Sequence, residues 1–400
     1  MKPVLAACLY LLLALAAQAA DWEGVFQGTL GKSKIIVQLV ETIDDREGDT
    51  RRETSRYSYL PKVRDINLML SGKQGELRFE ETLLQPYQYG SETETDKKVT
   101  GRWELRVKGD TGTGMWTSPD GKKSLPIRLT RLPEISATAA GPDRNVQIAT
   151  YDDLWARSVT FSDGGTGKTF GSVEVRTVKD SAFGVEFPVL GNFPDSPRRD
   201  KLNSVLLASH LRAVVQYREC KNAVPLGWEA ADAEPEISFE AAYASPRYLS
   251  YTESGSLSCG GAHPSNYVRP HSYDLLEAMV MGGVYQLDLS AQGFGRLLKL
   301  ANKEERIAFE RFALARWKQA ATKDPEMAAE CAKGWIDDSP EGEKDFYLSF
   351  EATGLAVTRV DYPHVASVCM FTDFNPTIIP WADLKPWLRP DQKLLTTEIQ

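Results

Sequence analysis

The sequence has few of the residues that most often carry enzyme chemistry. Its 400 residues include four histidines and five cysteines. No two cysteines are spaced as Cys-x-x-Cys, so the usual means of lowering the pKa of a redox thiol is missing. No Gly-x-Ser-x-Gly segment, the turn that presents a nucleophilic serine in many hydrolases, occurs either. We therefore predict that the protein is not an enzyme and that it holds no cofactor or metal ion.

Positive charge and long apolar runs are also scarce. Lys and Arg number 47 against 55 Asp and Glu, which gives a net charge of −8. An acidic balance disfavours binding to nucleic acid and to anionic membrane surfaces, and it mildly favours a basic partner. No second apolar run long enough to cross a membrane follows residue 17. We predict no nucleic-acid partner and no membrane span.

The first nineteen residues are typical of a secretory signal peptide. A basic start at Lys2 precedes an apolar run over residues 4–17, and Ala17-Gln18-Ala19 matches the small-x-small rule for cleavage. We predict cleavage after Ala19, a periplasmic location and, with Lys2 lost, a mature net charge of −9. Leu5-Ala6-Ala7-Cys8 also spells a lipobox, so a lipid anchor at Cys8 is an alternative. Because most of the apolar core lies after Cys8, soluble export is favoured.

Four cysteines remain in the mature chain, and an even number in an exported protein predicts two disulfides. Of the three possible connectivities we favour Cys220 with Cys259 and Cys331 with Cys369, because pairs that are near in sequence keep each bridge within one subdomain. Each bridge closes a loop of nearly forty residues. On the chain-entropy account such a bridge contributes about 4 kcal/mol to stability.

Residues 20–133 are predicted to form an all-β domain. Short segments rich in strand-forming residues alternate there with Gly, Asp and Ser turns, which is typical of a meander closed, or nearly closed, into a barrel. Residues 134–148 are small, polar and without periodicity, and we interpret them as a linker. The predicted strands are 24–28, 34–40, 66–70, 76–79, 101–107 and 125–129.

The remaining chain mixes helix and strand. Ser196-Pro197 predicts a helix start with proline at the first helical position, Asn302 with Glu305 predicts a capping pair, and Asp324-Pro325 predicts a shorter helix that carries Cys331. We divide this part into two halves of one disulfide-stapled module, residues 149–245 and 246–400. The fold class predicted for the whole chain is α+β, with a barrel-like β domain followed by a module with an antiparallel sheet.

The segment Cys259-Gly260-Gly261-Ala262-His263-Pro264 is the most informative in the chain. With other marks it resembles the tandem extracytoplasmic module, catalogued as domains of unknown function, of RsiV-type anti-sigma factors and PdaC-type deacetylases. The resemblance covers residues 176–390, and residues 21–133 are similar, more faintly, to an uncharacterised β domain that begins Trp-x-Gly-x-Phe-x-Gly. The other marks are Phe187-Pro188, Asn203, Tyr273-Asp274-Leu275 and residues 379–388.

The resemblance implies an α+β extracytoplasmic domain without known catalysis, which in the anti-sigma factors senses lysozyme by binding it. This chain has no deacetylase domain, transmembrane helix or cytoplasmic sigma-binding segment, so the signalling role does not carry over. The four cysteines suit an oxidising periplasm.

The Gly-Gly-Ala-His-Pro turn has a structural and a functional interpretation. Two glycines and a proline define a tight turn without any ligand. On the functional interpretation, His263, Pro264 and Asn266 contact a protein partner. A zinc site from Cys259, His263, His271 and Asp274 is a weaker alternative, because the spacing matches no usual finger and a disulfide would consume the thiol.

Two other motifs imitate catalytic or cofactor sites. Gly164-Gly165-Thr166-Gly167-Lys168-Thr169 imitates a phosphate-binding loop, but the required first glycine falls on Ser162, and we predict instead a turn at Asp163-Gly164-Gly165. Ser256 and Ser258 lie near His263 in sequence, which does not create a triad.

We conclude that the sequence predicts a non-enzymatic periplasmic binding protein that recognises or inhibits a protein, such as a basic cell-wall hydrolase like lysozyme. An immunity protein against a toxin delivered to the periplasm and a peptidoglycan hydrolase are the alternatives.

Overall fold

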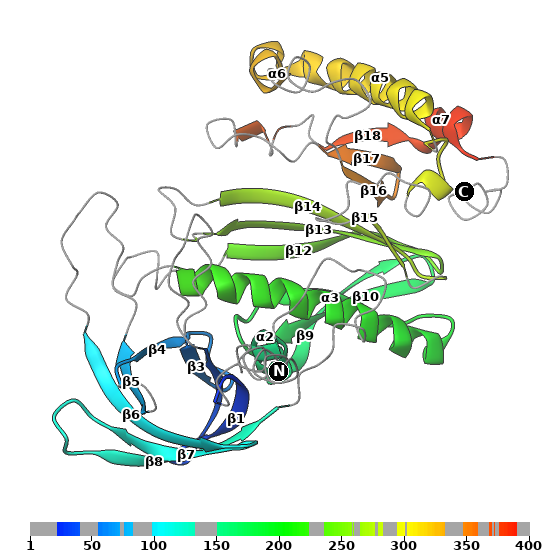
Figure 1. The fold of residues 1–400 in the computed structure, drawn as a ribbon. Coiled ribbons are helices and arrows are strands. Elements are labelled where there is room, and N and C mark those ends of the chain that lie inside the picture. The colour runs from blue at the N-terminus through cyan, green and yellow to red at the C-terminus, as the bar shows by residue number, and fades with distance from the viewer. Residues whose placement is uncertain are drawn as a thin grey trace, which may run out of the picture. The chain divides into compact units, whose positions relative to one another are not determined.

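A computed structural model shows the chain divided into two compact units, Met1–Thr160 with Arg218–Ala233 and Phe161–Tyr217 with Glu234–Gln400 (Figure 1). The predicted signal peptide and linker lie outside the described residues. Those are 22–40, 55–72, 76–82, 98–132, 150–223, 236–257, 259, 265–276, 279–282, 294–300, 302–332, 347–358, 368–369, 372 and 376–389.

The first unit contains a closed, antiparallel, eight-stranded barrel. Consecutive strands pair with each other, and β8 pairs back with β1. The predicted barrel-like domain is therefore confirmed, although β3 and β7 escaped the sequence-based prediction because they are rich in Ser, Thr, Gly and Arg. The strands are β1 (Gly24–Leu30), β2 (Ser33–Leu39), β3 (Ser55–Tyr59), β4 (Ile66–Leu70), β5 (Leu77–Thr82), β6 (Val99–Lys108), β7 (Thr111–Thr117) and β8 (Ser124–Arg131).

Side chains alternate between the interior of the barrel and solvent. On β6, Trp103 and Leu105 are buried, whereas Arg102 and Glu104, which alternate with them in sequence, are exposed. This alternation is expected because successive side chains of a strand point to opposite faces. Twelve buried apolar or aromatic side chains fill the interior, so the barrel is a packed core. They are Phe26, Leu30, Ile35, Val37, Leu39, Tyr57, Leu68, Phe79, Trp103, Leu105, Ile127 and Leu129.

One carboxylate, that of Glu81, is buried in this barrel. Its Oε2 accepts hydrogen bonds from Tyr57 Oη at 2.8 Å, Trp116 Nε1 at 2.7 Å and Trp103 Nε1 at 3.3 Å, and its Oε1 accepts one from Thr100 Oγ1 at 2.7 Å. Four donors compensate for the hydration that the carboxylate loses on burial. Burial, together with the charge of Glu81, raises the pKa of Tyr57.

The first unit also holds a buried ionic cluster. The Arg218 side chain is fully buried and donates to Asp152 Oδ1 at 2.6 Å and to Asp65, while Arg56 lies 3.1 Å from each of the same two carboxylates. Two cations thus balance two anions away from water. Asp152 lies on α2 (Thr150–Ala156), whose Tyr151 donates to Asp65 at 2.7 Å, so the cluster joins this helix to the β3–β4 connection.

The second unit contains three antiparallel sheets. The central sheet has the order β12-β13-β14-β15, and each flanking sheet has three strands. Their members are β9 (Phe161–Phe170), β10 (Val173–Asp180) and β11 (Glu186–Leu190), then β12 (Glu236–Ala244), β13 (Tyr248–Leu257), β14 (Ser265–Asp274) and β15 (Met279–Gly282), then β16 (Tyr347–Glu351), β17 (Gly354–Thr358) and β18 (Thr377–Pro380).

The two faces of the central sheet bury different cores. Helix α3 (Ser196–Ala223) lies along one face (Figure 1), and its Leu202 and Leu206 share a core with Leu249 of β13 and Val175 of β10. The other face packs against β16 and β17, where Phe350 meets Tyr248 with ring centroids 4.5 Å apart. Residues of α3 up to Tyr217 belong to the second unit, and the end of the helix, from Arg218 onward, belongs to the first.

Three of the helices begin at an Asp or Asn side chain that accepts a backbone N–H of the first turn. Asn302 Oδ1 accepts the N–H of Glu305 at 2.8 Å at the start of α5 (Lys303–Ala320), which confirms the predicted capping pair. Asp324 Oδ1 accepts the N–H of Met327 at 3.1 Å at the start of α6 (Pro325–Ala332). For α3 the predicted cap was misplaced by one residue, because the side chain that accepts the N–H of Arg198 is that of Asp195.

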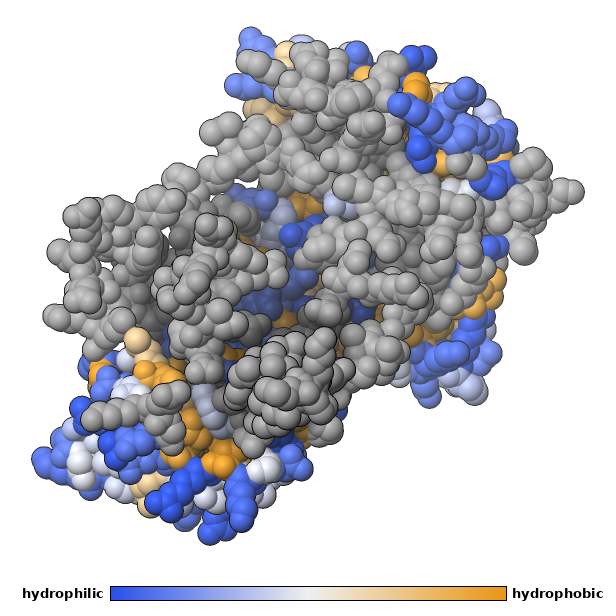
Figure 2. Space-filling view, viewed as in Figure 1, coloured by the Kyte–Doolittle hydropathy of each residue, from blue (hydrophilic) through white to orange (hydrophobic). Residues whose placement is uncertain are grey.

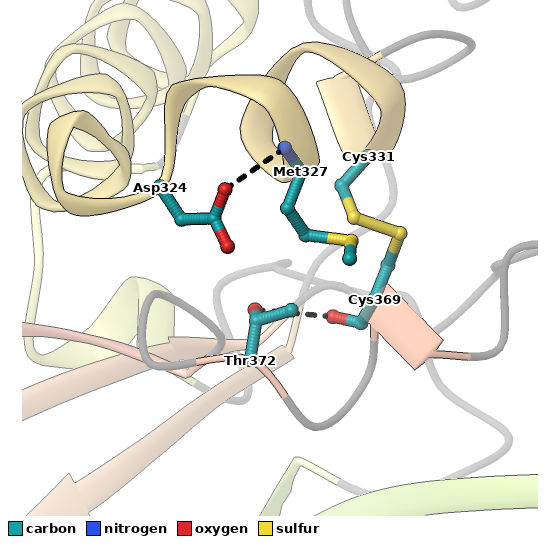
Figure 3. Close-up of a disulfide and its surroundings, with 5 residues drawn as sticks. All are labelled: Asp324, Met327, Cys331, Cys369 and Thr372. Atoms are coloured by element: carbon teal, nitrogen blue, oxygen red, sulfur yellow. Dashed lines mark hydrogen bonds between the residues drawn. A yellow bond between two sulfur atoms is a disulfide. The ribbon is translucent and has the colours of Figure 1, made fainter.

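A disulfide joins Cys331 of α6 to Cys369, with their Cα atoms 5.5 Å apart (Figure 3). Both half-cystines are about 1% exposed and belong to the core around Phe309 and Phe350. Cys220 and Cys259 are also disulfide-bonded. The disulfide tethers the short helix α6 to the segment that precedes β18.

The antiparallel sheets and few helices confirm the predicted α+β class. The remaining short helices are η3 (Phe294–Arg296), η4 (Ala321–Lys323), α7 (Trp381–Leu384) and η6 (Lys385–Trp387). Within the part of the chain that the structure describes, no helix is both long and apolar enough to cross a membrane.

Candidate functional site

Of the three residues predicted to contact a partner, the structure places Asn266. It is half-buried in the second position of β14, where the strand leaves the segment that contains the Gly-Gly-Ala-His-Pro motif. His263 and Pro264 lie outside the described residues. The surroundings of Asn266 therefore define where a site can be built.

Asn266 stands in a row of polar residues that crosses three strands. The antiparallel register pairs Glu236 of β12 with Ser256 of β13, and Ser256 with Asn266. Directly paired residues point to the same face of a sheet, and neighbouring strands lie about 4.8 Å apart. The carboxylate, hydroxyl and amide therefore come from adjacent strands on one face.

A second polar row lies beside the first. Ser238 pairs with Ser254, and their hydroxyl oxygens are 2.9 Å apart. The two rows surround an open hollow of about 510 Å³ at this end of the central sheet. The hollow is lined by Glu236, Ile237, Ser238, Ser254, Gly255, Ser256 and Asn266.

Gly255 is needed where it stands in the hollow. A Cβ atom at this position would lie 2.8 Å from the carbonyl oxygen of Glu236 and 2.9 Å from Tyr267 Oη, both closer than real Cβ atoms approach. The absence of a side chain lets β12 and the Tyr267 ring approach β13 closely.

The opposite face of the same strands is fixed by a buried ionic and aromatic cluster. Glu253 Oε2 lies 2.8 Å from His271 Nε2, and Glu253 Oε1 accepts a hydrogen bond of 2.5 Å from Tyr217 Oη of α3. Burial by itself raises the pKa of Glu253, but the hydrogen bond and charge of His271, with the Tyr217 hydrogen bond, outweigh it and lower that pKa. The cluster fixes β13 and β14 to α3.

A chain of hydroxyl groups continues this cluster along α3. Tyr273 Oη lies 2.8 Å from Tyr251 Oη and donates to Ser209 Oγ at 3.1 Å. The Tyr251 ring also stacks on His271, with centroids 4.8 Å apart. Burial raises the pKa of both tyrosines, so they act as neutral hydrogen-bonding groups.

A fully buried histidine, His210, joins α3 to the flanking sheet. His210 Nε2 lies 3.2 Å from Asp180 Oδ2, and the imidazole stacks on Phe187 with centroids 4.3 Å apart. Asp180 also accepts the N–H groups of Ala182 and Phe183. Burial works against ionisation of Asp180, but its hydrogen bonds to His210 and to Phe183 prevail and lower its pKa. This pair is enclosed and serves packing.

The Asn203 mark of the sequence resemblance also has a packing role. Its side-chain amide forms two hydrogen bonds with the backbone of Leu190, accepting the N–H at 2.8 Å and donating to the carbonyl at 2.9 Å. The side chain therefore forms, at the end of β11, the two backbone hydrogen bonds that a neighbouring strand would otherwise form, and it joins β11 to α3.

The residues considered for zinc have other partners. Cys259 is disulfide-bonded, His271 contacts Glu253, and Asp274 accepts the N–H of Leu276. Among the described residues, no group of three or more His, Cys, Asp and Glu side chains is arranged to hold a metal ion.

The segment that imitates a phosphate-binding loop is a strand. Gly164 to Thr169 lie within β9, and a bulge opposite Arg176 and Val178 of β10 interrupts the ladder. Asp163 forms an ion pair of 2.7 Å with Arg176. We predicted a turn at Asp163-Gly164-Gly165, but these residues lie within β9, at the bulge where the register passes from Asp163 opposite Val178 to Gly167 opposite Arg176.

Comparison with known proteins adds a likeness to a domain of unknown function. No family model matches the chain, and no curated protein matches it. A crystal structure of a member of the DUF3298 family from Bacteroides fragilis is similar at 13% sequence identity and a TM-score of 0.35, over 60% of this chain and 97% of that one. The description of that neighbour mentions neither anti-sigma factors nor deacetylases.

Sequence reasoning missed most of the hollow and all of the cluster behind it. Glu236, Ser238 and Ser254 are ordinary polar residues in sequence, and the strand register alone brings them beside Asn266. One signal was available, since Tyr251, Glu253 and Gly255 alternate on β13 with Ser250, Thr252 and Ser254. That alternation indicates that the strand has two different faces. It does not indicate which element covers each face.

Proposed function

We propose that this chain is an exported, non-enzymatic binding protein of the periplasm that recognises another protein. The observation that supports this most is the open hollow at the end of the central sheet, lined by serine, asparagine and glutamate side chains from three strands. Small polar side chains on a rigid support suit adaptable hydrogen bonding to a protein surface.

The rigidity of the support comes from the opposite face. Glu253 is 2% exposed and holds His271 and Tyr217, so the strands beneath the hollow are tied to α3. A surface that is ordered before binding loses less entropy when the partner arrives. This favours recognition by an existing surface.

The character of the exposed surface also favours a polar interface. Among the coloured residues in Figure 2, the hydrophilic ones predominate and the hydrophobic ones form separate groups. The large hydrophobic side chains exposed among the described residues are spread along the chain, and only two of them, both on β4, are neighbours in sequence. They are Met69, Leu70, Met115, Leu276, Val368 and Ile378.

A basic cell-wall hydrolase such as lysozyme is the partner that we propose. The predicted signal peptide would deliver the chain to the compartment where such enzymes act, and the mature net charge of −9 would accelerate encounter with a basic protein. The resemblance to a module that binds lysozyme in anti-sigma factors is the third support.

Binding and inhibition measurements on the purified mature chain test this function. We expect hen egg-white lysozyme to bind with a micromolar or lower Kd that weakens with salt, and its lysis of cell walls to slow in proportion to occupancy. Ribonuclease A, a basic protein that is not a cell-wall hydrolase, is the control for charge alone. Absence of binding to lysozymes and to envelope-directed toxins at micromolar concentration, or turnover of peptidoglycan by the chain itself, would contradict the proposal.

A further inference from the structure

We infer that the hollow at the end of the central sheet binds the guanidinium group of an arginine presented by the protein partner. This inference rests on the proposed function and assigns it a surface and a chemical group. The carboxylate of Glu236, the hydroxyl of Ser256 and the amide of Asn266 stand in one row on one face. Ser238 and Ser254 add two hydroxyl groups beside them.

The acceptors of the hollow match what a guanidinium requires. Guanidinium is planar and carries five N–H donors, which suit a carboxylate flanked by further oxygen acceptors. Glu236 supplies the carboxylate, and the Asn266 amide and the serines supply neutral oxygens from adjacent strands. An ammonium group has three donors around a point and would leave more of these acceptors unused.

The charge of the hollow is unbalanced within the described residues. Glu236 is exposed, and no cationic side chain in the described ranges forms an ion pair with it. By contrast, Glu240, two positions along the same face of β12, lies 3.9 Å from Lys168 Nζ. A cation from a partner would balance the charge of Glu236, as Lys168 balances that of Glu240.

Other ligand classes fit the lining less well. None of the described lining residues carries an aromatic ring, so a sugar would have no face on which to stack. A phosphate or carboxylate would be repelled by Glu236. An apolar side chain would cover the polar groups of five lining residues without giving them hydrogen-bond partners.

The test uses the full mature chain and a pair of capped peptides that differ in one group. Acetyl-Ser-Arg-Ser-amide is titrated while backbone amide signals are followed by NMR, and the peptide with citrulline in place of arginine is the matched neutral ligand. We expect saturable shifts at Gly255, Ser256 and Asn266 with the arginine peptide, and affinity at least about tenfold weaker with citrulline. Equal shifts with both peptides, or shifts confined to other residues, would overturn the inference.

Two substitutions on the same strand and face complete the test. Glu236→Gln should weaken arginine-peptide binding about tenfold, whereas Glu240→Gln should leave it unchanged. Both residues are exposed, and circular dichroism with thermal unfolding verifies that each variant folds. Equal binding by Glu236→Gln and the unsubstituted chain would overturn the assignment.

Failure of this inference is distinguishable from failure of the proposed function. If lysozyme binds the unsubstituted chain and Glu236→Gln equally well, the hollow is not the contact surface, although the chain is still a binding protein. If the arginine peptide binds at the hollow while lysozyme and other hydrolases do not bind, the guanidinium site stands and the hydrolase partner is wrong.

Discussion

The imidazole of His271 lies 2.8 Å from the carboxylate of Glu253, and both belong to the face of the central sheet that packs against α3. The hollow occupies the other face of the same strands. The two arrangements are therefore parts of one structure, in which buried charge on one side holds the strand ends that present polar groups on the other.

Loss of the Glu253 carboxylate should destabilise the second unit in a pH-dependent way. The folded-state pKa of Glu253 is lowered, so its contribution is present above the unfolded-state pKa of about 4.3 and is lost as pH falls through the folded-state pKa. Glu253→Gln should lower the free energy of unfolding by about 1.5–3 kcal/mol at pH 7. Urea unfolding from pH 7 to pH 3 should show this difference shrinking below about pH 4. A difference that stays constant over this range would contradict the assignment, and Glu236→Gln is the exposed control.

Removal of the Arg218 guanidinium should destabilise the first unit strongly. Arg218→Met leaves Asp65 and Asp152 buried with Arg56 as their remaining cation. We expect a loss of about 3–5 kcal/mol, measured by denaturant unfolding followed by tryptophan fluorescence. Arg102→Met is the matched control, because Arg102 is exposed and lies 3.6 Å from Glu80, and its loss should be about 1 kcal/mol or less. Similar losses for the two variants would show that the buried cluster does not stabilise the barrel unit.

Gly101→Ala should disrupt the hydrogen bonds of Glu81. An added Cβ would lie 2.1 Å from Trp116 Nε1, which donates to Glu81 at 2.7 Å, so the indole must move and leave the buried carboxylate with fewer donors. We expect a loss of about 2–4 kcal/mol and a change in Trp116 fluorescence. Gly109→Ala, at a turn with open space and a φ of +57°, should cost about 1 kcal/mol, and an equal or greater effect there would contradict the account.

Peptide mapping without reductant should recover Cys331 linked to Cys369 and Cys220 linked to Cys259. The first bridge closes a sequence separation of 38 residues, so Cys331→Ala with Cys369→Ala should lower the free energy of unfolding by about 4 kcal/mol. Because both half-cystines are buried, reductant should act on this bridge mainly after unfolding. Recovery of free Cys259 would contradict the second pairing and restore the zinc alternative.

N-terminal sequencing of exported protein should begin at Ala20. The predicted cleavage follows Ala19, after the small-x-small motif. A lipid-modified N-terminus at Cys8, detected by mass spectrometry of the membrane fraction, would instead support the lipobox alternative.

Short sequence patterns predicted the start of an element correctly where a single interaction between sequence neighbours determines it. The capping pair of Asn302 with Glu305 involves neighbours in sequence, and the structure shows that hydrogen bond. The α3 cap failed by one residue because Asp195 and Ser196 are both good caps, and only the backbone path chooses between them. β3 was missed because Ser55–Tyr59 owes its burial to pairing with β2 and β4.

The candidate site was predictable at one position only. Asn266 was found through its nearness in sequence to the glycine motif. Glu236, thirty residues earlier, joins it solely through the pairing of both residues with Ser256. Cross-strand neighbours are selected by register, which depends on the hydrophobic pattern of whole strands and on the turns between them.

The sequence by itself determined the α+β class and the cysteines available for bridges, because composition and local conformational preference are properties of short segments. Only the tertiary structure decided that Glu253 is buried on the face toward α3, beside His271, while Glu236, Ser256 and Asn266 line an open hollow. The physical reason is that a strand points alternate side chains to opposite faces, and the packing of distant elements determines which face loses water. The glycine motif that first stands out in the sequence thus leads, through its neighbour Asn266, to a surface assembled from three strands.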